Sequence, residues 1–148
     1  MNTLRLEAGM RHWGHDITDE DTPLEAGLGF AVAWDKPVDF AGRAALEAQR
    51  GQPRTKRLIQ FRLEDPDLLT YHDEPVTRDG VVVGRTSSSM WSATQERCCS
   101  MGYVTHDDAV TKDWLDAGTW EIDVAGRRVP ASASIRSWYD PRNERVRM

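Results

Sequence analysis

The spacing of hydrophobic residues divides the chain into two parts. Near the start, Leu4, Leu6 and Met10 lie among good helix formers, and this pattern predicts a short helix that ends near Met10. The mostly apolar run over residues 28–34 is bounded by turn residues and predicts a buried strand. An alanine-rich stretch over residues 40–50 predicts a second helix, which the glycine and proline that follow bring to an end.

Beyond residue 55 the pattern alternates between apolar and polar positions, as it does in half-buried strands. The odd positions from Ile59 to Leu63 are apolar and share one face of a predicted strand. Asp79-Gly80 precedes three valines and predicts a tight hairpin, because glycine readily takes a positive φ. Two further alternating runs between residues 119 and 135 complete the pattern of a compact antiparallel barrel or sandwich.

These patterns predict an α+β protein in which a short αβα segment precedes an antiparallel β-barrel. We expect residues 1–50 to form the first unit, residues 55–140 to form the barrel domain, and residues 141–148 to be a tail. The first unit is too short to hold a core alone, so it must dock on another surface. Its helical pattern starts at residue 2, and we therefore expect the chain to lack the part of the domain that would precede this motif.

The overall charge limits the classes of partner. The 148 residues carry a net charge of −5, which argues against non-specific binding to nucleic acid. Residues 54–57 and 142–147 are locally basic, although solvated surfaces explain such runs more often than polyanion sites do. No apolar run approaches the ~20 residues of a transmembrane helix, so we expect no membrane partner.

The two cysteines, Cys98 and Cys99, are adjacent. Neighbouring side chains in a strand point to opposite faces, so an internal disulfide between them is strained and we expect none. No signal peptide is visible in the sequence. Together these features predict a reducing compartment and a cytoplasmic location.

Several groups of residues offer weak candidates for chemistry. The H-x-x-H-D run over residues 12–16 has residue types that ligate zinc or iron, but a metal site usually needs a fourth ligand and a rigid frame. Ser87–Ser89 lack the elbow motif of an activated serine. A nucleophilic thiol at Cys98 or Cys99 would need a base such as His106 within reach, and core packing is the commoner role. The sequence has no phosphate-binding glycine loop of the Rossmann or P-loop kind.

Arg5 and Trp13 are better candidates, because they suit a flat polar ligand. A guanidinium makes paired hydrogen bonds to carbonyl groups on a ring, and an indole stacks on the ring face. The alternative interpretation pairs Arg5 with a nearby carboxylate and places Trp13 in the core. Spacing alone favours that alternative.

These residues lie in a segment with a family resemblance. The run LRLEAGMRHWGHDIT and the residues that follow it to Phe30 resemble the late part of the folate-binding domain of the glycine-cleavage T-protein (aminomethyltransferase) family. Residues 73–87 and 100–104 resemble the carboxyl-terminal barrel of that family. The ending YDPRNERVR, together with RHWGHD, is more similar to the carboxyl-terminal regions of sarcosine and dimethylglycine dehydrogenases. The resemblance covers nearly the whole chain.

The resemblance implies one-carbon chemistry, in which tetrahydrofolate takes up a carbon from an aminomethyl or N-methyl donor. Arg5 matches the family arginine that hydrogen-bonds the pterin ring, and Trp13 occupies a position where an aromatic residue near the folate is usual. Glu7 lies on the same predicted helix and has a supporting role. The resemblance also suggests Arg142 or Arg145 as a contact of the folate tail.

The sequence departs from the family in three ways. The catalytic aspartate and the main pterin-binding glutamate of the family lie upstream of the matched segment, so we assign no catalytic residue here. In the dehydrogenase branch an FAD domain first oxidises the amine, but this sequence has no G-x-G-x-x-G and we expect no FAD site. Ser88-Ser89-Met90-Trp91 replaces a stretch with a Gly-Gly pair, which we expect to alter that loop.

Three hypotheses follow. The chain is the carboxyl-terminal segment of a folate-dependent aminomethyltransferase and is inactive alone. Alternatively, it is a separately encoded, non-catalytic subunit that assembles with a protein partner carrying the amino-terminal half. As a third alternative, it is a free-standing barrel module that binds another ligand. We also expect self-association that buries Leu28, Phe30 and Trp34, since an unfinished sheet leaves exposed edges.

Overall fold

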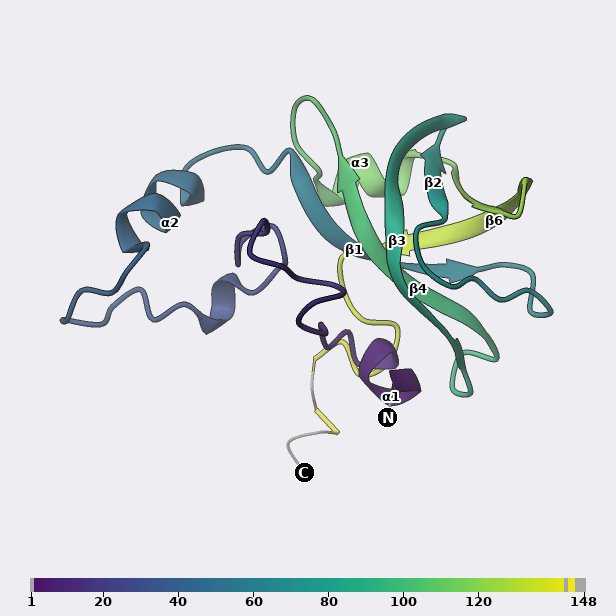
Figure 1. Cartoon of the computed structure of the whole chain (residues 1–148), viewed down its shortest axis with the longest axis horizontal. Helices are drawn as coiled ribbons and strands as arrows, with labels where there is room; N and C mark the ends of the chain where they lie inside the picture. Colours follow the sequence, from purple (N-terminus) through teal and green to yellow (C-terminus); the bar gives the residue numbers. More distant parts are fainter. Residues whose placement is uncertain (1, 143, 146–148) are drawn as a thin grey trace.

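The computed structural model describes residues 2–142, 144 and 145. Within that part, a six-stranded barrel is accompanied by three α-helices and one short 3₁₀-helix (Figure 1). The helical elements are α1 (Asn2–Glu7), η1 (Gly29–Ala31), α2 (Arg43–Arg50) and α3 (Lys112–Ala117). The strands are β1 (Lys56–Leu63), β2 (Pro75–Arg78), β3 (Val81–Ser92), β4 (Arg97–Thr105), β5 (Trp120–Val124) and β6 (Arg127–Ser134).

The strands form a closed antiparallel barrel in the order β1-β4-β3-β2-β5-β6, which confirms the predicted barrel. Closure pairs β1 with both β4 and β6, so that the first and last strands share a ladder. Tight hairpins connect β2 to β3 and β5 to β6. In the first of them Asp79 and Gly80 have φ angles of 51° and 82°, as a type I′ turn requires.

The barrel interior holds the main hydrophobic core. The inward positions of β1 are those that the alternating pattern predicts, and Phe61 and Leu63 are fully buried. Helix α3 closes one end of the barrel with Leu115, whose carbonyl accepts a hydrogen bond from the Trp120 indole at 2.9 Å. Each large apolar side chain buried in this way contributes roughly 1.5–3 kcal/mol to folding.

A second apolar cluster lies on the outer surface of the barrel. Leu6 of α1 packs there against Leu58, Cys99 and Met101 of β1 and β4. Cys98 faces the interior core whereas Cys99 faces this outer cluster, and both thiols are free. The opposite orientation of the two cysteines is the one that a strand dictates. The amino-terminal segment therefore docks on the barrel through α1.

The strand predicted over residues 28–34 is wrong. This segment contains the 3₁₀-helix η1 instead, and Phe30 is 84% exposed. An isolated strand leaves its backbone groups unpaired unless a neighbouring strand meets them. Here the segment satisfies them locally: the Trp34 indole donates to the Gly29 carbonyl at 2.9 Å, and the Ala31 amide donates to the Leu28 carbonyl. The first unit is therefore helical, without the β element of the predicted αβα segment.

Two predicted helices are shorter than the sequence pattern suggests. Helix α1 ends at Glu7, where the chain turns, and α2 begins at Arg43 after Gly42. The segment over residues 35–52, which includes α2, stands away from the barrel (Figure 1), and α2 contains no buried residue. Among the described residues no helix is long and apolar enough to cross a membrane.

The close approach of β3 and β4 predicts that Gly102→Ala strongly destabilises the barrel. A Cβ atom at Gly102 would lie 2.1 Å from the Arg85 carbonyl oxygen, and backbone cannot yield as a flexible side chain can. We expect the free energy of unfolding to fall by about 2–3 kcal/mol in urea denaturation, as for overpacked cores. Gly51→Ala is the control, because its Cβ would meet only Ala48 O at 4.0 Å, and a change beyond about 0.5 kcal/mol there would contradict the argument.

The buried thiols predict slow alkylation of the native protein. Burial raises the pKa of the Cys99 thiol to about 11, so at pH 8 the reactive thiolate is scarce as well as shielded. We expect Ellman's reagent to label neither cysteine on the timescale of minutes in buffer, and to label both at once in denaturant. Rapid labelling of one thiol in the native protein would show that β4 opens locally.

Candidate functional site

The centre of the candidate site is a buried ion pair between α1 and the loop that follows it. Arg5 Nη1 donates to Asp16 Oδ2 at 2.5 Å, and the Arg5 side chain is 17% exposed while that of Asp16 is fully buried. The second nitrogen, Arg5 Nη2, donates to Ser88 Oγ of β3 at 2.9 Å. The guanidinium of Arg5 is thus held in one orientation by two separate parts of the chain.

Asp16 accepts further hydrogen bonds from the protein, which replace those that water would make to its carboxylate. Its Oδ2 atom accepts from the backbone amide of His12 at 2.8 Å, and its Oδ1 atom accepts from Ser87 Oγ at 2.6 Å. A buried carboxylate is tolerated only when its oxygens are paired in this way. The tight loop over residues 12–17 places the His12 amide beside the carboxylate, because the Asp16 amide in turn donates to the His12 carbonyl.

A β-bulge explains why two successive serines serve the same ion pair. The register between β3 and β4 shifts between Thr86 and Ser88, so that Ser87 is the extra residue. In a regular strand neighbouring side chains point to opposite faces, whereas a bulge re-aims them. Ser87 therefore reaches Asp16 while Ser88 reaches Arg5.

From the sequence we expect a loop at Ser88–Trp91, the segment that replaces the family's Gly-Gly stretch. The structure has a strand there instead. It belongs to β3 and pairs with residues 98–101 of β4. Each of its residues has a partner on β4, from Ser88 opposite Met101 to Trp91 opposite Cys98. The departure from the family pattern nevertheless reaches the site, since the hydroxyl of Ser88 occupies one hydrogen of the Arg5 guanidinium.

A cavity of 200 Å³ opens beside Arg5. It is lined by polar and aromatic side chains from α1, the following loop, the segment before β2, and β3: Asn2, Arg5, His12, His15, Tyr71, His72, Ser87, Ser88, Ser89 and Met90. A wider groove of 810 Å³ adjoins it, shares His15, His72 and Ser87, and continues past Lys56, Arg85 and Tyr103. Arg5 retains one free hydrogen on Nη2, and its Nε is buried without a partner among the described residues.

The far wall of the groove contains a second charged cluster. Lys56 Nζ donates to Asp21 at 2.7 Å and lies 4.7 Å above the Tyr103 ring. Burial works against the Asp21 carboxylate, but hydrogen bonds from Lys56 and Thr18 outweigh it and lower the pKa of Asp21. Burial, helped by the charges of Asp21 and Glu25, raises the pKa of Tyr103 well above its usual value. The far wall of the groove therefore presents the neutral hydroxyl of Tyr103 beside the ion pair of Lys56 and Asp21.

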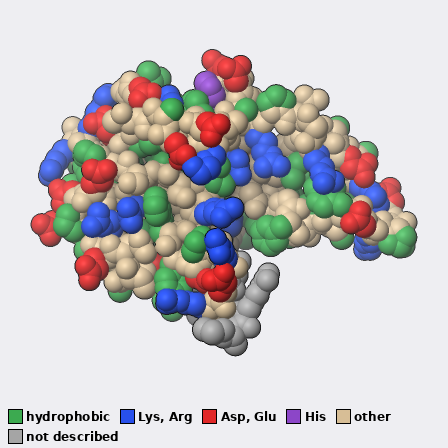
Figure 2. Space-filling view, turned by 180° about the vertical axis from the view of Figure 1, so that it is seen from behind, with side chains coloured by type: hydrophobic (Ala, Val, Ile, Leu, Met, Phe, Trp, Pro, Cys, Tyr) green, Lys and Arg blue, Asp and Glu red, His purple; other side chains and the backbone are tan. Residues whose placement is uncertain are grey.

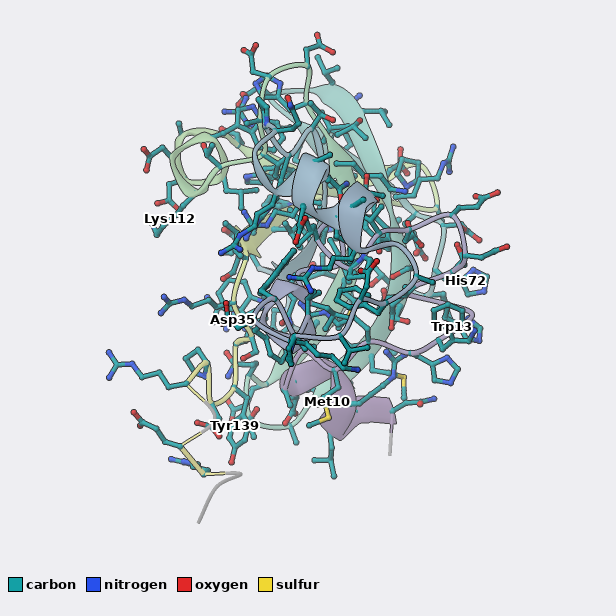
Figure 3. All side chains as sticks on the ribbon, turned by 90° about the vertical axis from the view of Figure 1, so that its left-hand side faces the viewer. Met10, Trp13, Asp35, His72, Lys112 and Tyr139 are labelled. Carbon is teal, nitrogen blue, oxygen red and sulfur yellow. The ribbon has the colours of Figure 1, made fainter. Side chains whose placement is uncertain are left out.

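Trp13 does not line the cavity beside Arg5, nor does it lie in the core. Its side chain is 71% exposed, and the residue forms a backbone bridge with Ile17. Figure 3 shows Trp13 on the same side of the molecule as His72, which does line the cavity. Spacing alone favoured Arg5 in an ion pair with Trp13 buried: the first half of this interpretation agrees with the geometry and the second half is wrong.

Glu7 serves as an anchor in this structure. It is 2% exposed, and its Oε1 atom accepts from Ser92 Oγ at 2.7 Å and from the Thr94 amide at 3.4 Å. These contacts hold α1 against the end of the β3–β4 hairpin. Its carboxylate is not among the groups that line the cavity.

The weaker candidates do not assemble into sites. The His12 and His15 rings lie 4.9 Å apart, but Asp16 is turned toward Arg5, and no group of three or more potential metal ligands occurs among the described residues. His106 stacks on Trp114, and the Cys98 sulfur contacts Thr70 instead. In the tail, Arg142 lies 3.7 Å from Glu144.

Sequence reasoning missed Asp16 and Ser88 as partners of Arg5, and Ser87 as a partner of Asp16. Asp16 was considered only as a metal ligand, although its position eleven residues after Arg5 fits a helix followed by a tight loop. The two serines lie more than eighty residues from Arg5, and nothing in the local pattern reveals the bulge that brings them together.

Comparisons with known proteins agree with this architecture. Residues 56–140 match the glycine cleavage T-protein C-terminal barrel domain, and residues 1–36 match the GCVT N-terminal domain. A crystal structure of the glycine cleavage system aminomethyltransferase T from Bartonella henselae superposes with a TM-score of 0.79 at 21% identity, over 95% of this chain and 38% of that one. This likeness shows the shared fold.

Several curated relatives span nearly all of the chain. It is 37% identical to 4-methylaminobutanoate oxidase (formaldehyde-forming) of Paenarthrobacter nicotinovorans, covering 99% of this chain and 17% of the oxidase. It is 35% identical to human mitochondrial sarcosine dehydrogenase, covering 99% of this chain and 16% of the dehydrogenase. It is 38% identical to the aminomethyltransferase of Parasynechococcus marenigrum, covering 93% of this chain and 36% of the transferase. The chain thus resembles the carboxyl-terminal region of these proteins, and it belongs to the glycine cleavage T-protein family.

Proposed function

We propose that this chain forms the carboxyl-terminal part of a tetrahydrofolate-dependent aminomethyltransferase-like protein, which handles one-carbon units from N-methyl or aminomethyl donors. The observation that carries the proposal is the fixed guanidinium of Arg5 at the wall of a cavity. We assign residues 1–50 to the end of the folate-binding domain, residues 55–140 to the barrel and 141–148 to the tail.

In this proposal Arg5 binds the pterin ring. A pterin presents adjacent hydrogen-bond acceptors on a planar edge, which suits a rigid guanidinium. The Arg5 side chain is held by Asp16 and Ser88, so little conformational entropy is lost when it binds a ligand. Trp13 stands exposed nearby and supplies an aromatic face, while Glu7 keeps α1 in place against the barrel.

We further propose that the 148-residue chain alone transfers no carbon. None of the described residues that line the cavity is a carboxylate, and both oxygens of Asp16, the partner of Arg5, already accept hydrogen bonds. Acid–base catalysis needs a group within reach of the reacting atoms. The chain covers 36% of the aminomethyltransferase it matches, so much of that relative has no counterpart here.

The exposed segment over residues 28–53 suggests a protein partner. Phe30 and Val38 are 84% and 65% exposed, and α2 has no buried residue. We propose that a polypeptide carrying the amino-terminal half of the folate-binding domain, and the FAD domain where there is one, covers this segment. The chain would then be a separately encoded non-catalytic subunit. Alternatively, a second copy of this chain covers the segment through Leu28, Phe30 and Trp34.

A cytoplasmic location stays a prediction, since relatives such as human sarcosine dehydrogenase are mitochondrial.

One observation favours a second candidate, a barrel module that binds another ligand. The Ser88 hydroxyl occupies a hydrogen of Arg5 that a glycine at this position would leave for a ligand. Binding of tetrahydrofolate decides between the two candidates.

Calorimetric titration with tetrahydrofolate tests the role of Arg5. We expect Arg5→Lys to weaken binding at least tenfold, because lysine keeps a positive charge beside Asp16 but loses the planar guanidinium whose free Nη2 hydrogen is held toward the cavity. Arg5→Ala should abolish binding, but it also leaves Asp16 buried without its cation, at a cost of about 3–5 kcal/mol of stability. The lysine variant therefore carries the test. Arg127→Ala is the control, since Arg127 lies on the far hairpin and contacts Asp65. Absence of heat with the wild-type chain would favour the non-folate candidate.

Isotope transfer from a labelled aminomethyl donor to tetrahydrofolate tests the dependence on a partner. We expect no transfer above the uncatalysed rate by the purified chain, because none of the described residues that line the cavity is a carboxylate and much of the aminomethyltransferase it matches has no counterpart here. Addition of a separately produced polypeptide with the relatives' preceding half should restore transfer and bring the two into one sedimenting species. Robust transfer by the 148-residue chain alone would refute the proposal.

A further inference from the structure

The basic run over residues 54–57 is divided by the strand that it enters. Lys56 lies on the outer face of β1, where Asp21 neutralises it. Arg57 follows on the inward-facing side, in line with Ile59 and Phe61, at the end of the barrel where α3 packs. The two neighbouring cations therefore differ in their surroundings, and among the described residues only Lys56 has a carboxylate partner.

Arg57 lies in a cavity that the folate proposal does not use. This cavity of 480 Å³ lies between the start of β1, α3 and the end of β6. Three cationic side chains line it, Arg57, Lys112 and Arg136, and they come from distant parts of the sequence. Leu115 and Ile135 form its apolar wall.

The charges in this cavity are poorly compensated. Lys112 pairs with Asp116, the one carboxylate in the lining. No carboxylate among residues 2–142, 144 and 145 lies within ion-pair distance of Arg57 or Arg136, so two guanidinium charges remain in excess. Such an excess stands out in a chain with a net charge of −5.

Arg57 also has a hydrogen-bond donor to spare. Its Nη1 atom donates to the Val110 carbonyl at 3.3 Å, whereas its Nε atom is buried and has no partner in the described part of the chain. Burial, and secondarily the charge of Arg54, lowers the pKa of Arg57. A half-buried guanidinium that lacks a counter-charge, and one of whose nitrogens is buried without an acceptor, is stabilised by an anion that reaches it.

The cavity is separate from the one beside Arg5. Figure 3 shows Lys112 on the opposite side of the molecule from Trp13 and His72, and the two cavities share no lining residue. Lys and Arg side chains gather across the middle of the face seen in Figure 2, the rear of the view in Figure 1.

We propose that the cavity formed by Arg57, Lys112 and Arg136 binds a small dianionic oxyanion, the phosphate or dicarboxylate group of a metabolite. The guanidinium groups of Arg57 and Arg136 contact the anion in the planar geometry that carboxylates and phosphates share. The Ser134 hydroxyl accepts from the Arg136 amide at 3.1 Å and keeps its own hydrogen for the ligand. Leu115 and Ile135 contact the apolar body of that ligand. This site does not depend on folate binding.

Calorimetry with inorganic phosphate and with succinate, in separate titrations at low ionic strength, tests the proposal. We expect one of the two anions to bind and to shift the Nε–H resonance of Arg57 in ¹⁵N-edited spectra. Arg136→Gln should weaken that binding at least tenfold, and because Arg136 is exposed this variant keeps the fold. Arg57→Gln should weaken it further. The anion that binds identifies whether the ligand carries phosphate or carboxylate groups.

Arg127→Gln is the matched control, since it removes an exposed arginine far from the cavity and should leave anion affinity unchanged. Equal affinity in the wild type and the Arg136→Gln variant would overturn the proposal, as would the absence of binding by both anions. An equal loss in Arg127→Gln would show a general effect of net charge and would also overturn it. Melting temperatures of all variants separate loss of the site from loss of the fold.

Discussion

The buried ion pair between Arg5 and Asp16 is the interaction on which the candidate site depends. Removing Arg5 would leave the carboxylate of Asp16, which is fully buried, without its cation, and this costs several kcal/mol. The pair also joins three distant parts of the chain, because α1 supplies the arginine, the following loop supplies the aspartate, and β3 supplies the two serines. The orientation of the Arg5 guanidinium therefore depends on the docking of α1 against the barrel.

Barrel closure supplies the rigid frame for both cavities. The bulge at Ser87 can aim two successive serines outward only because β3 is held by β4 on one side and β2 on the other. At the far end, α3 closes the barrel and brings Lys112 beside Arg57. One site thus lies on the outer wall under α1 and the other at the end that α3 covers. Neither could form from its own segment of sequence.

The barrel was predictable because its signals are local. Alternation over β1 and the Asp79-Gly80 turn each determine structure within a few residues. Helix α3 was missed although Thr111 provides a capping signal, with its hydroxyl accepting from the Trp114 amide at 3.1 Å. The strand expected over residues 28–34 failed for another reason, since an apolar run forms a strand only where a partner strand is available. The short, irregular structure around Phe30 reflects the absence of such a partner within the described chain.

The sequence by itself determined the family, the antiparallel barrel, and the opposed and unpaired cysteines. All of these rest on motifs or on the fixed periodicity of strands. Only the tertiary structure decided that Arg5 is held by Asp16 and Ser88, that Trp13 is exposed, and that the basic run divides between a neutralised Lys56 and an Arg57 without a carboxylate partner in the described part of the chain. The physical reason is that burial and charge compensation depend on which distant segments meet, and no local pattern encodes those meetings.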